Sequence, residues 1–163
     1  MIKIAGIVND AIADGPGLRL AIFTQGCPHR CPGCHNQHTH DSAGGKWIAA
    51  EEIFRRIDAN PLLDGITLTG GEPFAQAAAL APVAAHARKK KLGVIAYTGY
   101  LWEEIAADPG FMALASLCNY IIDGKYDEGL RSLDLCYKGS ANQRIIDVKR
   151  SLETGSARVL ETL

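Results

Sequence analysis

Short apolar runs alternate with segments of helical periodicity along most of the chain. Runs rich in β-branched and other apolar side chains predict strands at residues 2–8, 18–24, 65–69, 93–97 and 120–123. Apolar positions three and four residues apart predict helices at residues 47–60, 74–91, 101–107 and 111–117. Strands that alternate with helices are typical of parallel βαβ units, whose right-handed crossovers put the helices on one side of a curled sheet. The pattern therefore predicts an α/β fold.

The same pattern predicts how far the domain extends along the chain. No internal repeat or low-complexity linker interrupts residues 1–152, which are predicted to form a single domain, and residues 153–163 are predicted to be a polar C-terminal tail. At 163 residues, 47% of them hydrophobic and 21% charged, the chain can bury a substantial core.

Charge and hydropathy exclude several classes of partner. The net charge of −1 provides no field that would attract nucleic acid or an anionic membrane. No apolar run approaches the roughly 18 residues of a membrane span. The N-terminus lacks the basic start and apolar core of a signal peptide. We therefore expect a cytoplasmic protein with no nucleic-acid or membrane partner.

Three of the five cysteines lie in one loop, residues 27–34 (CPHRCPGC). At this spacing, Cys27, Cys31 and Cys34 can bind one compact polynuclear centre. A 4Fe–4S cluster has four irons and normally takes four thiolates, so three thiolates would leave one iron open to a substrate or cofactor. Cys118 and Cys136 are expected to be ordinary semi-buried thiols.

Zinc is the alternative metal for this loop. Four of the five histidines lie in it or just after it, at positions 29, 35, 38 and 40, and zinc accepts mixed cysteine and histidine ligands. Structural zinc sites usually take pairs of ligands from two separate turns, whereas these thiols all come from one. The spacing therefore favours the cluster, and none of the histidines is predicted to be a metal ligand.

Five further segments accompany the cysteine loop: residues 14–19 (DGPGLR), 70–73 (GGEP), 97–100 (YTGY), 123–126 (DGKY) and 138–144 (KGSANQR). With them, the chain resembles the radical S-adenosylmethionine enzymes from about residue 4 to residue 152. The DGPG segment is similar to that of the glycyl-radical activases, and the DGKY and GSANQR segments resemble those of the activases of anaerobic ribonucleoside-triphosphate reductase. The resemblance implies an incomplete TIM-like barrel of parallel βα units. Chemistry in such barrels gathers at the carboxyl ends of strands, where the cysteine loop and three of these segments are predicted to fall.

The resemblance also implies a mechanism. The open iron of a 4Fe–4S cluster would hold S-adenosylmethionine, and its reductive cleavage would yield a 5′-deoxyadenosyl radical that takes a hydrogen atom from a glycine of the reductase. The implied partners are the reductase and a reduced electron donor such as flavodoxin or ferredoxin. No side chain is expected to be a catalytic acid or base, because the cofactor carries the chemistry.

Cofactor-binding residues are implied at the ends of three strands and in the cysteine loop. The glycine pair would let the backbone approach the cofactor, and the Glu72 carboxylate would accept a hydrogen bond from the cofactor ammonium. Thr98 matches a segment that lines the cofactor in related activases, and Lys125 would either neutralise the cofactor carboxylate or form a surface salt bridge. The residues assigned to cofactor binding are Gly70, Gly71, Glu72, Pro73, Thr98, Lys125 and His35, the last by stacking on the adenine.

Other residues and other functions have competing interpretations. Arg19 either helps to shape the site or forms a structural ion pair, Asn142 either recognises the nucleoside or bridges turns, and the roles of Asp14 and Asp123 stay open. One alternative function is activation of another glycyl-radical enzyme, such as pyruvate formate-lyase, whose activases are typically longer. An alternative of a different class is a non-enzymatic module that binds zinc or transfers electrons.

Overall fold

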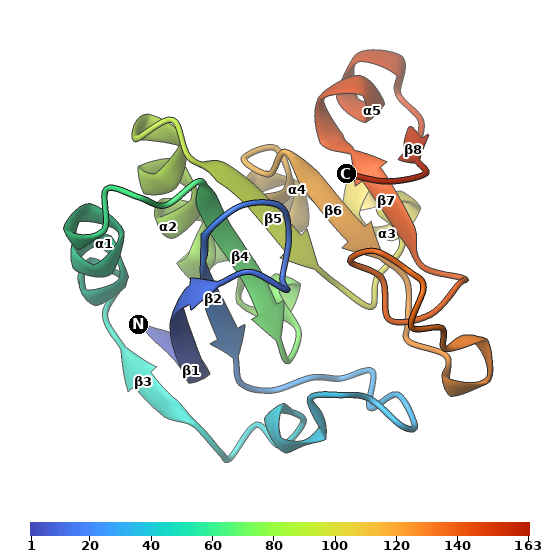
Figure 1. Cartoon of the computed structure of the whole chain (residues 1–163), viewed down its shortest axis with the longest axis horizontal. Coiled ribbons are helices and arrows are strands. Elements are labelled where there is room, and N and C mark those ends of the chain that lie inside the picture. The colour runs from blue at the N-terminus through green and yellow to red at the C-terminus, as the bar shows by residue number, and fades with distance from the viewer.

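The computed structural model describes all 163 residues and shows one mixed sheet with helices packed on one of its faces (Figure 1). The elements are β1 (Ile2–Ala11), β2 (Arg19–Thr24), β3 (Lys46–Ile48), α1 (Ala50–Ala59), β4 (Gly65–Gly70), α2 (Ala77–Lys89), β5 (Gly93–Tyr97), α3 (Trp102–Ala107), α4 (Pro109–Ala115), β6 (Tyr120–Asp123), β7 (Arg144–Asp147), α5 (Val148–Thr154) and β8 (Val159–Leu160). Three short 3₁₀ turns are η1 (Gln37–Thr39), η2 (Pro73–Gln76) and η3 (Glu128–Leu130).

The eight strands lie in the order β3-β1-β2-β4-β5-β6-β7-β8. The central four, β2, β4, β5 and β6, run parallel, and the pairs toward both edges are antiparallel. The predicted α/β fold with a parallel-rich sheet is thus confirmed. The predicted parallel βα units correspond to β2, β4, β5 and β6, whereas β1, β3, β7 and β8 pair antiparallel.

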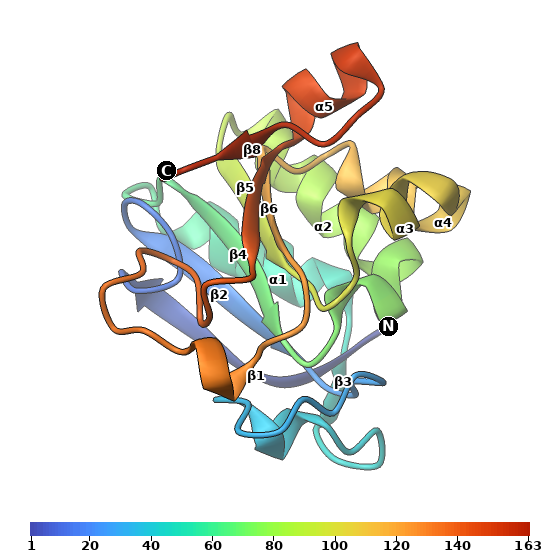
Figure 2. The same cartoon turned by 90° about the vertical axis from the view of Figure 1, so that its right-hand side faces the viewer.

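Burial explains why the central strands are continuous apolar runs. In β4, five of the six residues are buried, as expected of a parallel strand covered on both faces. In α2, Leu80, Val83, Ala84 and Ala87 recur on one face and are buried against the sheet. The main core, a cluster of 26 buried residues, therefore lies between the sheet and the helices. Figure 2 shows the helices α1 to α4 on one side of the sheet and long loops on the other.

The loop-bearing face of the sheet has its own small apolar cluster. Ile95, Ile122 and Ile145 form it, and Leu160 and Leu163 pack against it. The segment predicted to be a polar tail therefore contains β8 and two leucines that contact the sheet. Gly155 ends α5 in the left-handed conformation, with φ of 70°, and turns the chain back toward β7.

The largest local difference from the predicted elements lies at residues 46–48. The sequence predicts a helix from residue 47, but Lys46–Ile48 pairs antiparallel with β1 and the helix begins at Ala50. Pairing with Ile2 buries Ile48, which a helix starting at that position would leave near its frayed end. None of the helices is both long and apolar enough to cross a membrane.

Candidate cofactor site

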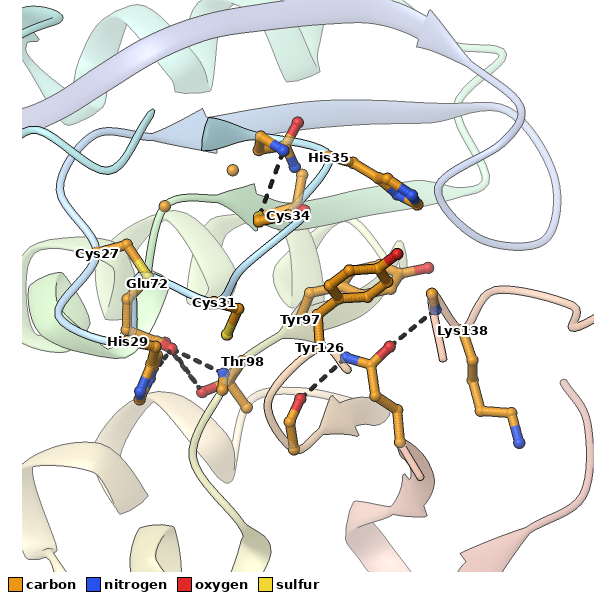
Figure 3. Close-up of a pocket in the computed structure, with 18 of the residues that line it drawn as sticks. Cys27, His29, Cys31, Cys34, His35, Glu72, Tyr97, Thr98, Tyr126 and Lys138 are labelled. Atoms are coloured by element: carbon orange, nitrogen blue, oxygen red, sulfur yellow. Dashed lines mark hydrogen bonds and ion pairs between the residues drawn. The ribbon is translucent and has the colours of Figure 1, made fainter. Parts of the chain in front are cut away.

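A cavity of about 350 Å³ lies at the carboxyl ends of the parallel strands. It is lined by the segments that follow these strands (Figure 3). The lining residues that the sequence assigned to metal or cofactor are Cys27, Cys31 and Cys34 after β2, Gly70, Gly71 and Glu72 after β4, Thr98 after β5, and His35. Segments that lie far apart in the sequence therefore meet at one edge of the sheet.

The three cysteines of the loop are free thiols of intermediate exposure. The backbone N–H of Asn36 donates to Cys34 Sγ at 3.4 Å. Burial raises the pKa of the Cys27 thiol, an effect that backbone hydrogen bonds from His29 and Arg30 partly offset. No group of three or more His, Cys, Asp or Glu side chains is arranged to hold a single metal ion. Three thiols on one cavity, with an N–H donor to sulfur, match the donor set of an iron–sulfur cluster.

Glu72 is fully buried and bonded within the protein. Its Oε1 accepts from Phe74 N at 2.9 Å and from Thr98 Oγ1 at 2.9 Å, and its Oε2 accepts from Gly99 N at 2.9 Å. His29 Nε2, from the cysteine loop, lies 2.8 Å from Oε2. Four groups thus fill the roughly four acceptor sites of a carboxylate. Glu72 therefore joins the ends of β4 and β5 to the cysteine loop.

The glycine pair approaches the chain's own backbone. Gly70 has φ of 91°, and Gly71 N donates to Thr24 O at 2.9 Å. A Cβ on Gly71 would lie 2.4 Å from the carbonyl oxygen of Gly26, the residue before Cys27. These glycines therefore allow close packing of the loop after β4 against the start of the cysteine loop. Pro73 is buried in the first turn of η2, where its fixed φ suits a helix start.

Segment 127–141, which we call the strap, crosses from β6 toward β7 and borders the cavity. Gln143, just after the strap, joins the end of the strap to the turn that precedes it, because its side chain accepts from Gly139 N at 2.8 Å and donates to Gly124 O at 2.9 Å. Asn142 Nδ2 donates to Lys125 O at 2.8 Å. Asn142 therefore bridges turns in this structure, which is one of its two predicted roles.

An aromatic group covers another part of the cavity wall. The rings of His35 and Tyr126 have centroids 5.2 Å apart, and Tyr97 also lines the cavity. The Tyr126 hydroxyl is buried and has no hydrogen-bond partner within the chain. A buried polar group without a partner is uncommon in native proteins, and here it belongs to a residue of the candidate site. This observation and the three thiols fit a site that takes a polar cofactor.

The strap brings Lys138, and not Lys125, to the cavity. Lys138 is among the lining residues, although Figure 3 shows its side chain extending away from the cysteines. Lys125 is exposed and borders a separate depression beside Pro32 and Glu128. The turn at Gly124, with φ of 99°, leaves Gly124 and Tyr126 on the cavity and Lys125 outside it.

Arg19 and Asp123 have structural contacts. The Arg19 guanidinium is buried and donates to Thr67 Oγ1 at 2.6 Å, Ile66 O at 2.5 Å and Gly93 O at 3.0 Å, and it makes no ion pair. Asp123 is buried against Arg144, whose Nε donates to its Oδ1 at 2.9 Å. These two residues hold the sheet and the end of β6 together.

Four other residues line the cavity although the sequence did not indicate them as site residues: His29, Tyr97, Tyr126 and Lys138. His29 lies between two cysteines and reads as an ordinary loop residue, because its partner Glu72 is 43 residues away. Tyr126 belongs to the DGKY segment, so its position in that motif was the one available signal.

Comparison with known proteins identifies the class. Residues 13–146 match the family model described as a 4Fe-4S single cluster domain. This match and the cysteine loop define a protein with a single 4Fe–4S cluster domain.

Relatives of similar sequence identify the family within this class. An anaerobic ribonucleoside-triphosphate reductase-activating protein from Salmonella typhi is 34% identical over 140 residues, which cover 81% of this chain and 90% of that protein. The chain belongs to the family of anaerobic ribonucleoside-triphosphate reductase-activating proteins. A pyruvate formate-lyase-activating enzyme from Clostridium pasteurianum is 40% identical over 79 residues, or 45% of this chain and 33% of that enzyme. Among solved structures, QueE from Escherichia coli aligns with a TM-score of 0.48 and 19% sequence identity, over 60% of this chain and 52% of that chain.

Proposed function

We propose that this protein is a radical S-adenosylmethionine activase that generates the glycyl radical of anaerobic ribonucleoside-triphosphate reductase. The observation that carries the proposal is the convergence of Cys27, Cys31 and Cys34 on one cavity with the segments after β4, β5 and β6. Membership of the reductase-activating family supports the choice of protein substrate. A reduced flavodoxin or ferredoxin would supply the electron.

The three cysteines would each hold one iron of a 4Fe–4S cluster and leave the fourth iron open. When bound, the cluster and S-adenosylmethionine supply one-electron chemistry that ends in abstraction of a hydrogen atom. Glu72 acts as a positioning residue, because it fixes the cysteine loop through His29 and the end of β5 through Thr98 and Gly99. His35 and Tyr126 would form the wall for the nucleoside part of the cofactor.

We further propose that residues 1–152 are one radical S-adenosylmethionine domain. Its parallel strands β2, β4, β5 and β6, with helices on one face, would correspond to part of a TIM-like barrel. A site at their carboxyl ends agrees with the rule for such barrels. The strap and the loop that contains Asp14 would cover the face that carries no helices.

The closest functional alternative is an activase for another glycyl-radical enzyme. Similarity to the formate-lyase-activating enzyme is higher per residue but covers only 33% of that enzyme, whereas the chain covers 90% of the reductase-activating relative. Overall length and coverage therefore favour the reductase as the substrate.

The test combines metal analysis with radical detection. Anaerobically purified protein should contain iron and sulfide, and Cys27→Ala, Cys31→Ala or Cys34→Ala should each lose the intact cluster. Cys136→Ala is the matched control, because Cys136 is an exposed cysteine that is not among the cavity-lining residues. Mixed with the reductase, a reductant and S-adenosylmethionine, the wild-type protein should produce a glycyl radical seen by electron paramagnetic resonance. A radical on formate-lyase but not on the reductase would support the alternative activase, and stoichiometric zinc without iron would support the non-enzymatic module.

A further inference from the structure

The strap carries two leucines that face solvent beside the cavity. Leu130 is 45% exposed and Leu133 is 88% exposed. Single exposed leucines are common on soluble proteins and by themselves indicate nothing. These two differ in their position, because Leu135, Tyr137 and Lys138 of the same strap line the cavity. One short segment therefore presents apolar side chains outward and forms part of the site wall.

The base of the strap is held in place from two directions. Ala141 N donates to Leu130 O at 2.8 Å, and Asp127 N donates to Ser140 Oγ at 3.1 Å, so the two ends of the strap are joined. Glu128 lies against the cysteine loop, where a Cβ on Gly33 would come within 2.5 Å of its carboxyl carbon. Residues 132–138 form neither helix nor strand. Leu130 thus sits at a fixed base, and Leu133 projects from the free part of the strap.

We propose that Leu130 and Leu133 are the docking contact for the reductase, on the surface that flanks its glycine-bearing segment. This inference rests on the proposed function, in which the substrate is a backbone glycine of a second protein. A protein segment that enters the cavity must pass its wall, and the strap is a part of that wall that carries two exposed leucines, with Leu133 the most exposed of the large hydrophobic side chains. The net charge of −1 provides no strong overall field to steer an encounter. Apolar side chains exposed beside the site are the surface that a partner protein could cover.

Two matched variants test the proposal. Leu133→Asp places a charge at the proposed contact, and Leu62→Asp places the same charge on a leucine that is 75% exposed. Leu62 lies in the connection between α1 and β4, at the end of the strands opposite the cavity (Figure 1). Both positions are exposed, so thermal unfolding should be unchanged in both variants.

The measurements are the affinity of the iron-loaded protein for purified reductase, the yield of glycyl radical, and cleavage of S-adenosylmethionine without the reductase. We expect Leu133→Asp to weaken reductase binding about tenfold or more, because the contact would bury an unpaired carboxylate. The radical yield at limiting protein should fall with it, whereas partner-free cleavage stays at the wild-type level. Leu62→Asp should match wild type in all three measurements.

Three results would overturn the docking surface: equal reductase affinity for Leu133→Asp and wild type, equal weakening by both variants, or loss of self-association in Leu133→Asp with its reductase affinity intact. The last result would identify a contact between copies of this chain. Failure of the proposed function would give one of two other results with the wild-type protein. Either it binds the reductase through this surface without forming a radical, or it does not bind the reductase at all. The second of these outcomes removes the docking surface together with the function.

Discussion

Replacement of Glu72 by glutamine separates a positioning role from direct contact with the cofactor. The carboxylate accepts a backbone N–H on each oxygen, from Phe74 on Oε1 and from Gly99 on Oε2. An amide has only one acceptor oxygen, so either orientation of glutamine points its NH₂ group at a backbone N–H. Rotating the side chain cannot relieve this conflict.

These contacts give the expected loss in the free energy of unfolding. Glu72→Gln loses at least one hydrogen bond to a charged acceptor and leaves a buried N–H unpaired, which together should destabilise the fold by about 3 kcal/mol. For a chain of this length, about 3 kcal/mol corresponds to a fall of roughly 6–12 °C in the unfolding midpoint. Because an uncharged amide also pairs more weakly with His29 than the carboxylate does, the cysteine loop should hold less iron after reconstitution.

The assay is anaerobic chemical and thermal unfolding of the cluster-free protein, followed by iron analysis of the reconstituted protein. Glu104→Gln is the matched control, because Glu104 accepts a backbone N–H from Leu101 in an exposed helix cap, where the loss should be about 1 kcal/mol or less. If Glu72→Gln unfolded within about 1 kcal/mol of wild type and kept its iron but failed to bind S-adenosylmethionine, the positioning argument would be refuted. The carboxylate would then act on the cofactor, as the sequence alone suggests.

The remaining predictions each concern one residue of the site or its surroundings. Gly71→Ala should destabilise the fold and lower iron loading, because its Cβ would meet Gly26 O, whereas Gly6→Ala, with nothing within 4 Å, should be neutral in both assays. Tyr126→Phe removes an unpaired buried hydroxyl, so denaturant unfolding should show an unchanged free energy of unfolding or a gain of up to about 1 kcal/mol. A clear loss of stability would show that the hydroxyl has a hydrogen-bond partner. Burial raises the pKa of Asp14, so ionisation of this carboxyl destabilises the folded state as pH rises through the carboxyl range. Asp14→Asn should therefore raise the melting temperature at pH 7. The gain in melting temperature should become small once the pH is lowered to about 3.5, where the wild-type carboxyl is protonated.

The bounds of the central strands could be predicted from the sequence to within one residue. β5 and β6 have the predicted bounds, and β2 and β4 differ by one residue at an end. These strands are buried on both faces, so each forms a continuous apolar run that needs no knowledge of its neighbours. Convergence of their loops was predictable for the same reason, since the carboxyl ends of parallel strands share one edge.

The outer strands and the contacts within the site were not predictable in this way. β7 (RIID) and β8 (VL) are short, and their strand character depends on pairing with a distant partner. The sequence predicts that the glycine pair leaves space for a ligand, and both glycines line the cavity. Gly71 also packs against Gly26, a contact that local sequence does not encode. Which lysine reaches the cavity depends in turn on the path of the strap.

The bonds around Glu72 constrain the order of events in maturation. They join residues separated by 43 positions in one contact and 26 in another, so the cysteine loop gains its final support only after β5 has added to β4. Contacts between distant parts of a chain form late in folding, because a large loop must close first. Small zinc domains fold around their metal. This chain, in contrast, is expected to complete its parallel sheet first and to receive iron as an already folded acceptor.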